Sequence, residues 1–151
     1  MRVSDFLKKE CCIMNLEADN KQEAMKEIVS CLHDAGKISD LDKFAEDVLE
    51  RESLGSTGIG YGIAIPHART ESVSGFAIGF GRASKGVDFN SIDGEKVSLI
   101  FLMGSDPAEL NRYLRLLAEL SKLLMNSSFR QALMDAQSPE EIIQIIRKFE
   151  S

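Results

Sequence analysis

Residues 55–70 read GSTGIGYGIAIPHART and contain the side chain best suited to chemistry, His67. Four glycines lie within residues 55–62, and His67 directly follows Pro66. An uncharged imidazole is a nucleophile near pH 7, and it can attack phosphorus and carry a phosphoryl group covalently. Glycine-rich backbone offers N–H groups at close range, and the guanidinium of Arg69 offers a planar pair of donors. These residue types together suit phosphoryl transfer through a histidine.

Other kinds of site fit the same stretch less well. A metal centre needs several converging ligands, and the chain has only two histidines, His33 and His67. A P-loop requires a lysine after its glycines, and none follows here. The spacing Gly58-x-Gly60-x-Gly62 is not that of a dinucleotide fingerprint, and a strand-like run follows it instead of a helix. The serine elbow GxSxG is absent. We therefore expect no metal and no cofactor.

The loop before His67 supplies candidate phosphate-binding residues. Ser56, Thr57 and Gly58 offer hydroxyl and backbone donors for phosphoryl oxygens. Turn formation accounts for these residue types equally well. His67 itself has a plainer interpretation, in which it is a turn residue and the glycines only shape a tight loop. His33 is expected to be a solvated residue on the polar side of a helix.

The composition is that of an ordinary globular protein, with 44% hydrophobic and 28% charged residues. Its 151 residues suit one domain, residues 1–151, and the net charge of −6 argues against nucleic-acid binding, which uses a basic face. No apolar run follows Met1 as in a signal peptide, and none approaches the ~20 residues that span a bilayer. Cys11, Cys12 and Cys31 form no CxxC pair and are interpreted as buried thiols. We expect a cytoplasmic protein without membrane insertion.

Capping signals predict four long helices. Asn20 starts the first, and Gly36 is a natural stop just beyond its end. Ser39 opens the second, Asp106 with a following proline opens the third, and Ser138 opens the last. The third helix is expected to bury one face of leucines, namely Leu110, Leu114, Leu117 and Leu124, with Tyr113 beside them.

Apolar runs before and between these helices predict strands over residues 11–18, 62–66, 75–82 and 97–103. The run at 97–103, VSLIFLM, is almost unbroken, which is typical of a central strand covered on both faces. Strands that alternate with helices indicate a layered α/β domain.

Residues 51–70, RESLGSTGIGYGIAIPHART, closely resemble the active-site segment of the phosphotransferase-system enzyme IIA domains of the mannitol/fructose type, which include nitrogen-related regulatory members. The family pattern is Arg-Glu, a glycine-rich stretch, and then G-I-A-[IV]-P-H-[AG]. Residues 86–103, GVDFNSIDGEKVSLIFLM, resemble the fructose-type members especially, and the resemblance covers nearly the whole chain.

This resemblance implies a single three-layer α/β domain, with a mixed β-sheet flanked by helices on both faces. It implies that His67 accepts phosphate from the phosphocarrier HPr, or from a nitrogen-type homologue. His67 would then pass the phosphate to a cysteine or histidine of a separate EIIB component. Arg51 stands where the family has its active-site arginine, sixteen residues before the histidine.

One position departs from the family pattern. Many members carry a second histidine in a stretch like H-L-x-x-L-A-x-L, and residues 113–120 here read YLRLLAEL. Tyr113 is therefore expected to point towards His67 and to donate a hydrogen bond without titrating. Three functions stay open: a sugar-transport carrier, a nitrogen-type regulator read by partner proteins, and a binding domain no longer phosphorylated. The sugar and the oligomeric state, monomer or homodimer, are also open.

Overall fold

The computed structural model describes residues 2–150. The central strand of its β-sheet is β6 (Val97–Ser105). All residues of β6 except Ser98 are buried, as an apolar run without a polar face requires. β6 pairs antiparallel with β5 (Phe76–Val87) on one side and parallel with β3 (Ile63–Ala64) and β4 (His67–Arg69) on the other. The prediction of a central strand is confirmed. The two end residues of the predicted domain, 1 and 151, lie outside the described residues.

Two short strands complete the sheet. β1 (Cys12–Ile13) runs parallel to β5, and β2 (Gly58–Gly60) runs antiparallel to β3. The strand order is β1-β5-β6-β3-β2, with β4 pairing β6 beside this path. Parallel and antiparallel pairs both occur, so the sheet is mixed, as expected.

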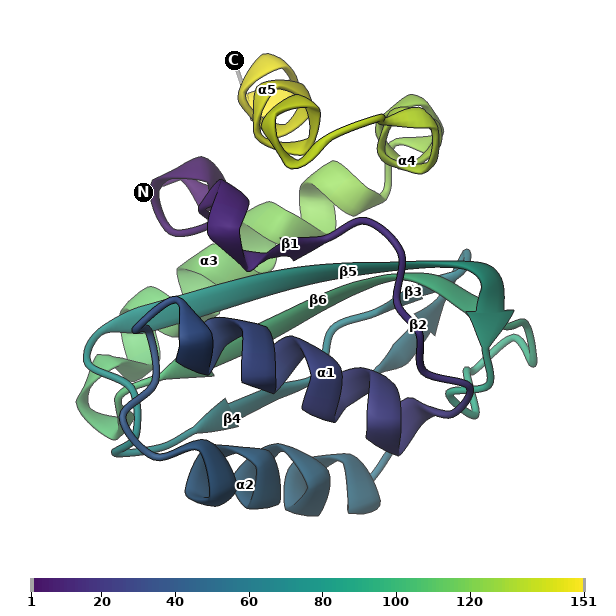
Figure 1. Cartoon of the computed structure of the whole chain (residues 1–151). Coiled ribbons are helices and arrows are strands. Elements are labelled where there is room, and N and C mark those ends of the chain that lie inside the picture. Colours follow the sequence, from purple (N-terminus) through teal and green to yellow (C-terminus); the bar gives the residue numbers. More distant parts are fainter. Residues whose placement is uncertain (1, 151) are drawn as a thin grey trace.

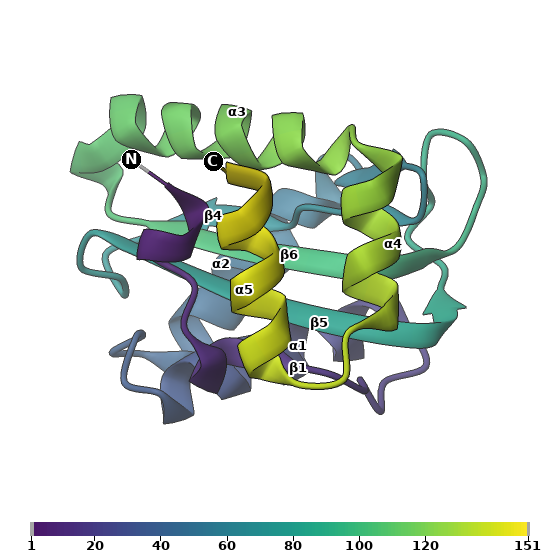
Figure 2. The ribbon, with the colours of Figure 1, turned by 90° about the horizontal axis from the view of Figure 1, so that it is seen from above.

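Helices cover both faces of the sheet and make a three-layer α/β fold (Figure 1). One face is covered by α1 (Lys21–Asp34) and α2 (Leu41–Ser53). The other is covered by α4 (Ser127–Asp135) and α5 (Pro139–Glu150), which lie over β5 and β6 in Figure 2, while α3 (Leu110–Leu124) runs along the β4 side of the sheet. The predicted fold class is therefore confirmed. Three short 3-10 turns accompany these elements: Val3–Asp5, Lys9–Cys11 and Pro107–Glu109.

Side-chain caps set the starts of the helices much as the sequence predicts. Asn20 Oδ1 accepts from the backbone N–H of Glu23 (2.9 Å), and Gly36 adopts a φ of +77° just after α1. The predicted cap of α2 is wrong by one residue. Asp40 caps that helix, because the hydroxyl of Ser39 is used to donate to the carbonyl of Ser72 (3.1 Å).

The expected strand over residues 62–66 is interrupted. β3 ends at Ala64, and the ladder to β6 resumes at His67, which starts β4, with the carbonyl of Pro66 accepting from the N–H of Met103 (2.9 Å). Pro66 has no N–H to donate to a sheet ladder, which accounts for the break. His67 therefore begins a strand instead of following one.

The predicted apolar face of α3 is right only in part. Leu124 is buried and Leu117 is partly buried against the core, as predicted, whereas Leu110 and Leu114 are 40% and 51% exposed. Tyr113, Leu116 and Leu120 complete the buried face. Both sets recur at helical spacing, so periodicity alone does not decide which one meets the sheet. The packing of the helix against the sheet selects the face that carries Tyr113.

A close approach at Gly104 seats α2 against the sheet. A Cβ at this position would lie 2.7 Å from two ring carbons of Phe44 and 3.0 Å from a methyl of Val73. Phe44 is fully buried on α2, and aromatic rings have little room to yield in a packed core. The absence of a side chain at 104 thus sets the distance between α2 and β6.

We expect Gly104→Ala to lower the free energy of unfolding by about 1–3 kcal/mol, because the added methyl group overpacks the interface with Phe44. Urea unfolding followed by circular dichroism measures the change. Gly55→Ala is the control, since a Cβ at position 55 meets nothing within 4 Å. A Gly104→Ala protein as stable as the unsubstituted chain would contradict this account of the interface.

Candidate functional site

His67 lies in a pocket at the edge of the sheet, between the C-terminal part of α2 and the start of α3. Among residues 2–150, β4 pairs only with β6, so its other edge is free to border a pocket of about 590 Å³. The C-terminal part of α2 and the start of α3 both contribute side chains to it. We name this hollow the His67 pocket. Its lining residues are Asp47, Glu50, Arg51, Leu54, His67, Ala68, Arg69, Leu110 and Tyr113.

One hydrogen bond fixes the proton on the His67 ring. Nδ1 lies 3.0 Å from the carbonyl oxygen of Ile65, two residues back in the chain. A carbonyl oxygen only accepts, so Nδ1 carries the hydrogen in this geometry. Nε2 is then left with its lone pair. The geometry therefore assigns the tautomer in which Nε2 is the nucleophilic nitrogen.

The surroundings keep this imidazole neutral. Burial lowers the pKa of His67 below its ordinary value of 6.5, and the charges of Arg51 and Arg69 lower it further. The carbonyl of Ile65 and the carboxylate of Glu52 act in the opposite direction without cancelling the effect. An uncharged ring with a free lone pair is what nucleophilic attack requires.

Two arginines bring positive charge to the pocket from different elements. Arg51 lies in the last turn of α2, and its Nη1 donates to the carbonyl of Gly55 (3.1 Å). Arg69 lies two residues after His67 on β4, so the two side chains project from the same face of the strand. A guanidinium has five N–H donors in a planar fork, which suits the oxygens of an anion.

Tyr113 joins the pocket from the first turns of α3. Its side chain is 4% exposed, and its ring centroid lies 5.7 Å from that of His67. The hydroxyl is buried, with no hydrogen-bond partner among residues 2–150. Burial raises the pKa of Tyr113 despite the opposing charges of Arg51 and Arg69, so the hydroxyl remains a protonated donor. An unpaired buried hydroxyl costs free energy until an acceptor arrives.

The structure does not bring Ser56, Thr57 and Gly58 into the His67 pocket. The Ser56 hydroxyl donates to the carbonyl of Phe89 and accepts from the N–H of Gly58 (3.0 Å). The hydroxyl and N–H of Thr57 both donate to the carboxylate of Glu52. These donors are therefore engaged in closing the loop, and turn formation accounts for them in this structure.

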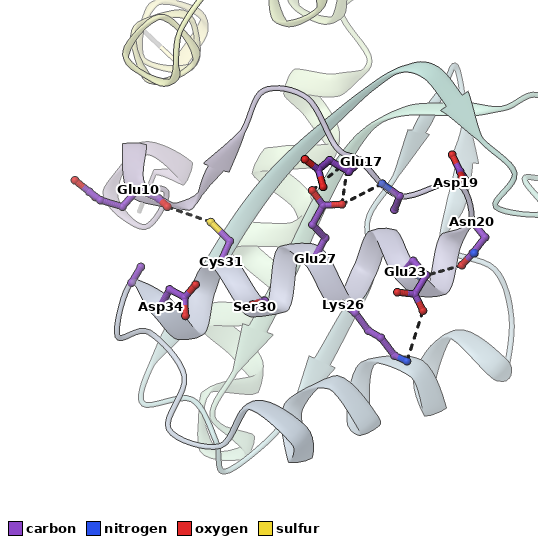
Figure 3. Close-up of a pocket in the computed structure, with 12 residues that line it drawn as sticks. Glu10, Glu17, Asp19, Asn20, Glu23, Lys26, Glu27, Ser30, Cys31 and Asp34 are labelled. Carbon is purple, nitrogen blue, oxygen red and sulfur yellow. Dashed lines mark hydrogen bonds and ion pairs between the residues drawn. The ribbon is translucent and has the colours of Figure 1, made fainter.

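A larger hollow of about 950 Å³ follows α1, and its chemistry is unsuited to anions (Figure 3). Six carboxylates line it with a single lysine, Lys26. Glu27 accepts from the backbone N–H groups of Glu17 and Ala18, at 3.1–3.2 Å. We call this hollow the acidic groove. Its negative charge would repel a phosphate, which leaves the His67 pocket as the candidate site.

The thiols are poor alternatives to His67 as nucleophiles. Burial raises the pKa of Cys11 to about 11 and that of Cys12 to about 12, so both stay protonated near neutral pH. Cys31 is only half-buried, contrary to the expectation for all three, and burial raises its pKa as well. His33 is exposed on α1, as predicted.

Sequence reasoning missed part of the pocket. Arg69 was named from the sequence as a donor near His67, and its place two positions along the strand puts it on the same face. Leu54 and Leu110 had no comparable signal, since leucine is by default a core residue. Leu54 is 81% exposed and Leu110 is 40% exposed, and both line the rim of the pocket.

The fold and the pocket define a class: a three-layer α/β protein with one neutral histidine and two arginines at a free sheet edge. The chain belongs to the family "Phosphoenolpyruvate-dependent sugar phosphotransferase system, EIIA 2", which it matches over residues 5–149. The resemblance found in the sequence is thereby confirmed.

Curated relatives carry fructose-related names. The chain is 42% identical to the "PTS system fructose-specific EIIABC component" of Bacillus subtilis over 148 residues, which are 98% of this chain and 23% of that protein. It is 33% identical to the "PTS system fructose-specific EIIA component" of Haloferax volcanii, over 83% of this chain and 82% of that protein. The chain thus spans about a quarter of the first relative and most of the second.

Solved structures share the fold. The nitrogen regulatory protein IIA-Ntr from Neisseria meningitidis superposes with a TM-score of 0.89 at 30% identity, covering 95% of this chain and 98% of that one. IIA mannitol from Escherichia coli gives a TM-score of 0.78 at 22% identity, covering 93% and 98%. The second match is evidence of the fold alone.

Two absences hold for residues 2–150. None of the helices there combines the length and apolar character needed to cross a membrane. In the same residues, histidine, cysteine, aspartate and glutamate side chains form no group of three or more able to hold a metal ion.

We expect the His67 ring to titrate below pH 6.5, and Arg51→Leu to raise its pKa by removing a nearby positive charge. Nuclear magnetic resonance of the imidazole C–H signals measures the midpoint, with Arg112→Leu on the exposed part of α3 as the control. Because the folded-state pKa is lowered, the unfolded chain binds the proton more tightly. His67 should therefore reduce stability as the pH falls from about 6.5 through the folded-state pKa. A midpoint at or above 6.5 would contradict the burial of the ring.

Proposed function

We propose that this chain is the phosphoryl carrier of a fructose-type sugar phosphotransferase system, with Nε2 of His67 as the acceptor. The observation that carries the proposal is the 3.0 Å bond between Nδ1 of His67 and the carbonyl of Ile65, which leaves Nε2 with its lone pair. The two arginines of the pocket supply the charge that a phosphoryl group needs. The donor is phosphorylated HPr, the next acceptor is an EIIB component, and both steps take place in the cytoplasm.

The transfer is a displacement at phosphorus. The Nε2 lone pair forms a bond to phosphorus as the bond from phosphorus to the donor atom breaks, and the donor keeps that electron pair. The proton on Nδ1 stays in its hydrogen bond to Ile65, so the ring does not need to rearrange. Arg51 and Arg69 face the negative charge on the three phosphoryl oxygens. Attack by a nucleophile of EIIB on the same phosphorus reverses the sequence.

The rim of the His67 pocket suits a protein as the phosphoryl donor. Leu54 and Leu110 line the pocket while exposed, and Leu114 lies one turn further along α3. Exposed leucines around a polar centre are the usual arrangement of a protein–protein contact, with an apolar surround that excludes water. A small phosphorylated metabolite bound at His67 would not need these exposed leucines as contacts.

Regulation of the nitrogen type is the second candidate, and the superposition on the Neisseria protein named for nitrogen regulation favours it. The higher identity of the two relatives named for fructose supports transport over regulation. Both functions use phosphorylation of His67 and differ in the reader. Transfer of labelled phosphate from the chain to a fructose-specific EIIB separates them, since a purely regulatory protein would retain its label.

We expect the chain, incubated with enzyme I, HPr and labelled phosphoenolpyruvate, to take up phosphate that is acid-labile and base-stable. His67→Ala should abolish the label, because it removes the imidazole that the proposal makes the phosphoryl acceptor, and the expected acid-labile, base-stable label distinguishes phosphohistidine from a base-labile acyl phosphate. His33→Ala, at the exposed histidine of α1, should label like the unsubstituted chain. Label that survives in His67→Ala would end the proposal, and no label on the unsubstituted chain would favour a binding domain that is not phosphorylated.

Tyr113 has a place in the same chemistry. Its hydroxyl lies in the pocket region with no acceptor, and the phosphoryl oxygens on Nε2 would provide one. The bond would exist only in the phosphorylated protein, so it would stabilise that state selectively. Because burial raises the pKa of the hydroxyl, the donor would stay protonated over the working pH range.

We expect Tyr113→Phe to shorten the lifetime of phospho-His67 or slow its formation by roughly 5- to 30-fold, which corresponds to about 1–2 kcal/mol for one hydrogen bond. The unphosphorylated variant should unfold at no lower urea concentration, because the lost hydroxyl has no partner there. Tyr113→His should add a pH dependence near about 6.5. If both variants show the kinetics and pH profile of the unsubstituted chain, Tyr113 is a packing residue only.

A further inference from the structure

A buried carboxylate, that of Glu52, does not line the His67 pocket, although its charge acts on the pKa of His67. Glu52 follows Arg51 in the last turn of α2, and its side chain is only 3% exposed. A charged group at such depth needs partners, and it has three donors. Oε1 accepts from the hydroxyl of Thr57 (2.6 Å), and Oε2 accepts from the N–H of Thr57 (3.0 Å) and from Nζ of Lys21 (3.4 Å).

The bonds to Thr57 fix the loop that connects α2 to β2. Residues 54–57 must reverse the chain within a few positions, and Glu52 holds the far end of this reversal through both donors of one residue. The same loop contains Gly55, whose carbonyl accepts from Nη1 of Arg51 (3.1 Å). The carboxylate thereby sets the position of the group that orients the Arg51 guanidinium.

A second line of contacts leads from Thr57 to the imidazole. The carbonyl of Thr57 accepts from the N–H of Ile65 (3.1 Å), and the carbonyl of Ile65 holds Nδ1 of His67 (3.0 Å). Ile65 lies in the gap between β3 and β4, and the next carbonyl, that of Pro66, accepts from the N–H of Met103 on β6 (2.9 Å). The bond from Thr57 holds the other side of Ile65, so it helps to orient the peptide whose carbonyl selects the tautomer of His67.

We propose that Glu52 is a positioning residue for the phosphoryl site, acting through Thr57 on both the Arg51 guanidinium and the tautomer of His67. Lys21, reaching across from α1, balances its charge and ties this arrangement to the first helix. The proposal rests on the proposed function for its transfer measurement and is independent of it for its spectroscopic one. The hydrogen bonds of Glu52 and Thr57 thereby connect α1, the loop after α2 and the segment at Ile65 to the imidazole of His67.

The test compares Thr57→Val, Thr57→Ser and Glu52→Gln with the unsubstituted chain. Valine keeps the shape of threonine and its backbone bond to Glu52 but removes the hydroxyl donor. We expect the ¹⁵N shifts of His67 to report the Nδ1–H tautomer in the unsubstituted chain and a larger share of the Nε2–H tautomer in Thr57→Val.

The rate of phosphoryl transfer from HPr should fall about 10-fold in Thr57→Val and about 100-fold in Glu52→Gln, through misplacement of the reacting groups. Thr57→Ser should restore both readouts.

Ser4→Ala is the matched control. The hydroxyl of Ser4 donates to Oε1 of Glu150 (2.6 Å), a bond of the same kind and length, and neither residue lines the His67 pocket. This variant should lose stability without any change in tautomer or transfer rate. The proposal is overturned if Thr57→Val keeps the tautomer and rate of the unsubstituted chain, or if Ser4→Ala changes them equally. If the unsubstituted chain takes up no phosphate, the proposed function fails, while the tautomer measurement still decides the role of Glu52.

Discussion

Every part of the His67 pocket depends on β6, the strand that is paired along both edges and buried on both faces. The ladder to β6 places His67 opposite Met103 and Arg69 opposite Ser105. The missing side chain at Gly104 admits Phe44, which brings α2 close enough for Arg51 to reach the pocket. The chain leaves β6 through the turn at Pro107–Glu109 and enters α3, which carries Tyr113. One rigid strand therefore sets the positions of four pocket residues that come from three elements.

Charge is distributed unevenly over the molecule. The chain has a net charge of −6, yet its pocket places Arg51 and Arg69, together with Asp47 and Glu50, around a neutral imidazole. The acidic groove along α1 concentrates the opposite charge elsewhere (Figure 3). The net charge of a protein thus predicts little about a single site, because local fields act over roughly 10 Å at ordinary ionic strength.

The pocket also shows how a small protein holds a reactive group without a metal-ligand cluster among its described residues. Burial and two cations keep the imidazole of His67 uncharged, and a backbone carbonyl keeps its proton on Nδ1. A buried carboxylate, Glu52, fixes the backbone that provides this carbonyl. Neutrality, tautomer and orientation are separate requirements, and a different interaction meets each of them.

The sequence by itself determined the class of fold and the central residue of the pocket. Unbroken apolar character identifies β6, and caps identify the helices, because both signals come from residues that are near one another in the chain. The segment IPHAR identifies His67, and the family pattern identifies Arg51.

What only the tertiary structure decided is which face of α3 meets the sheet, that Tyr113 is buried without a partner among residues 2–150, and that Ser56 and Thr57 are engaged in the loop. Leu110 and Leu116 have the same chemistry and fit the same helical period, so only the contacts made by the folded sheet distinguish the exposed residue from the buried one. A donor near a site in sequence is likewise available to a ligand only if no other part of the chain accepts from it, and such acceptors, like the carbonyl of Phe89, lie far away along the chain.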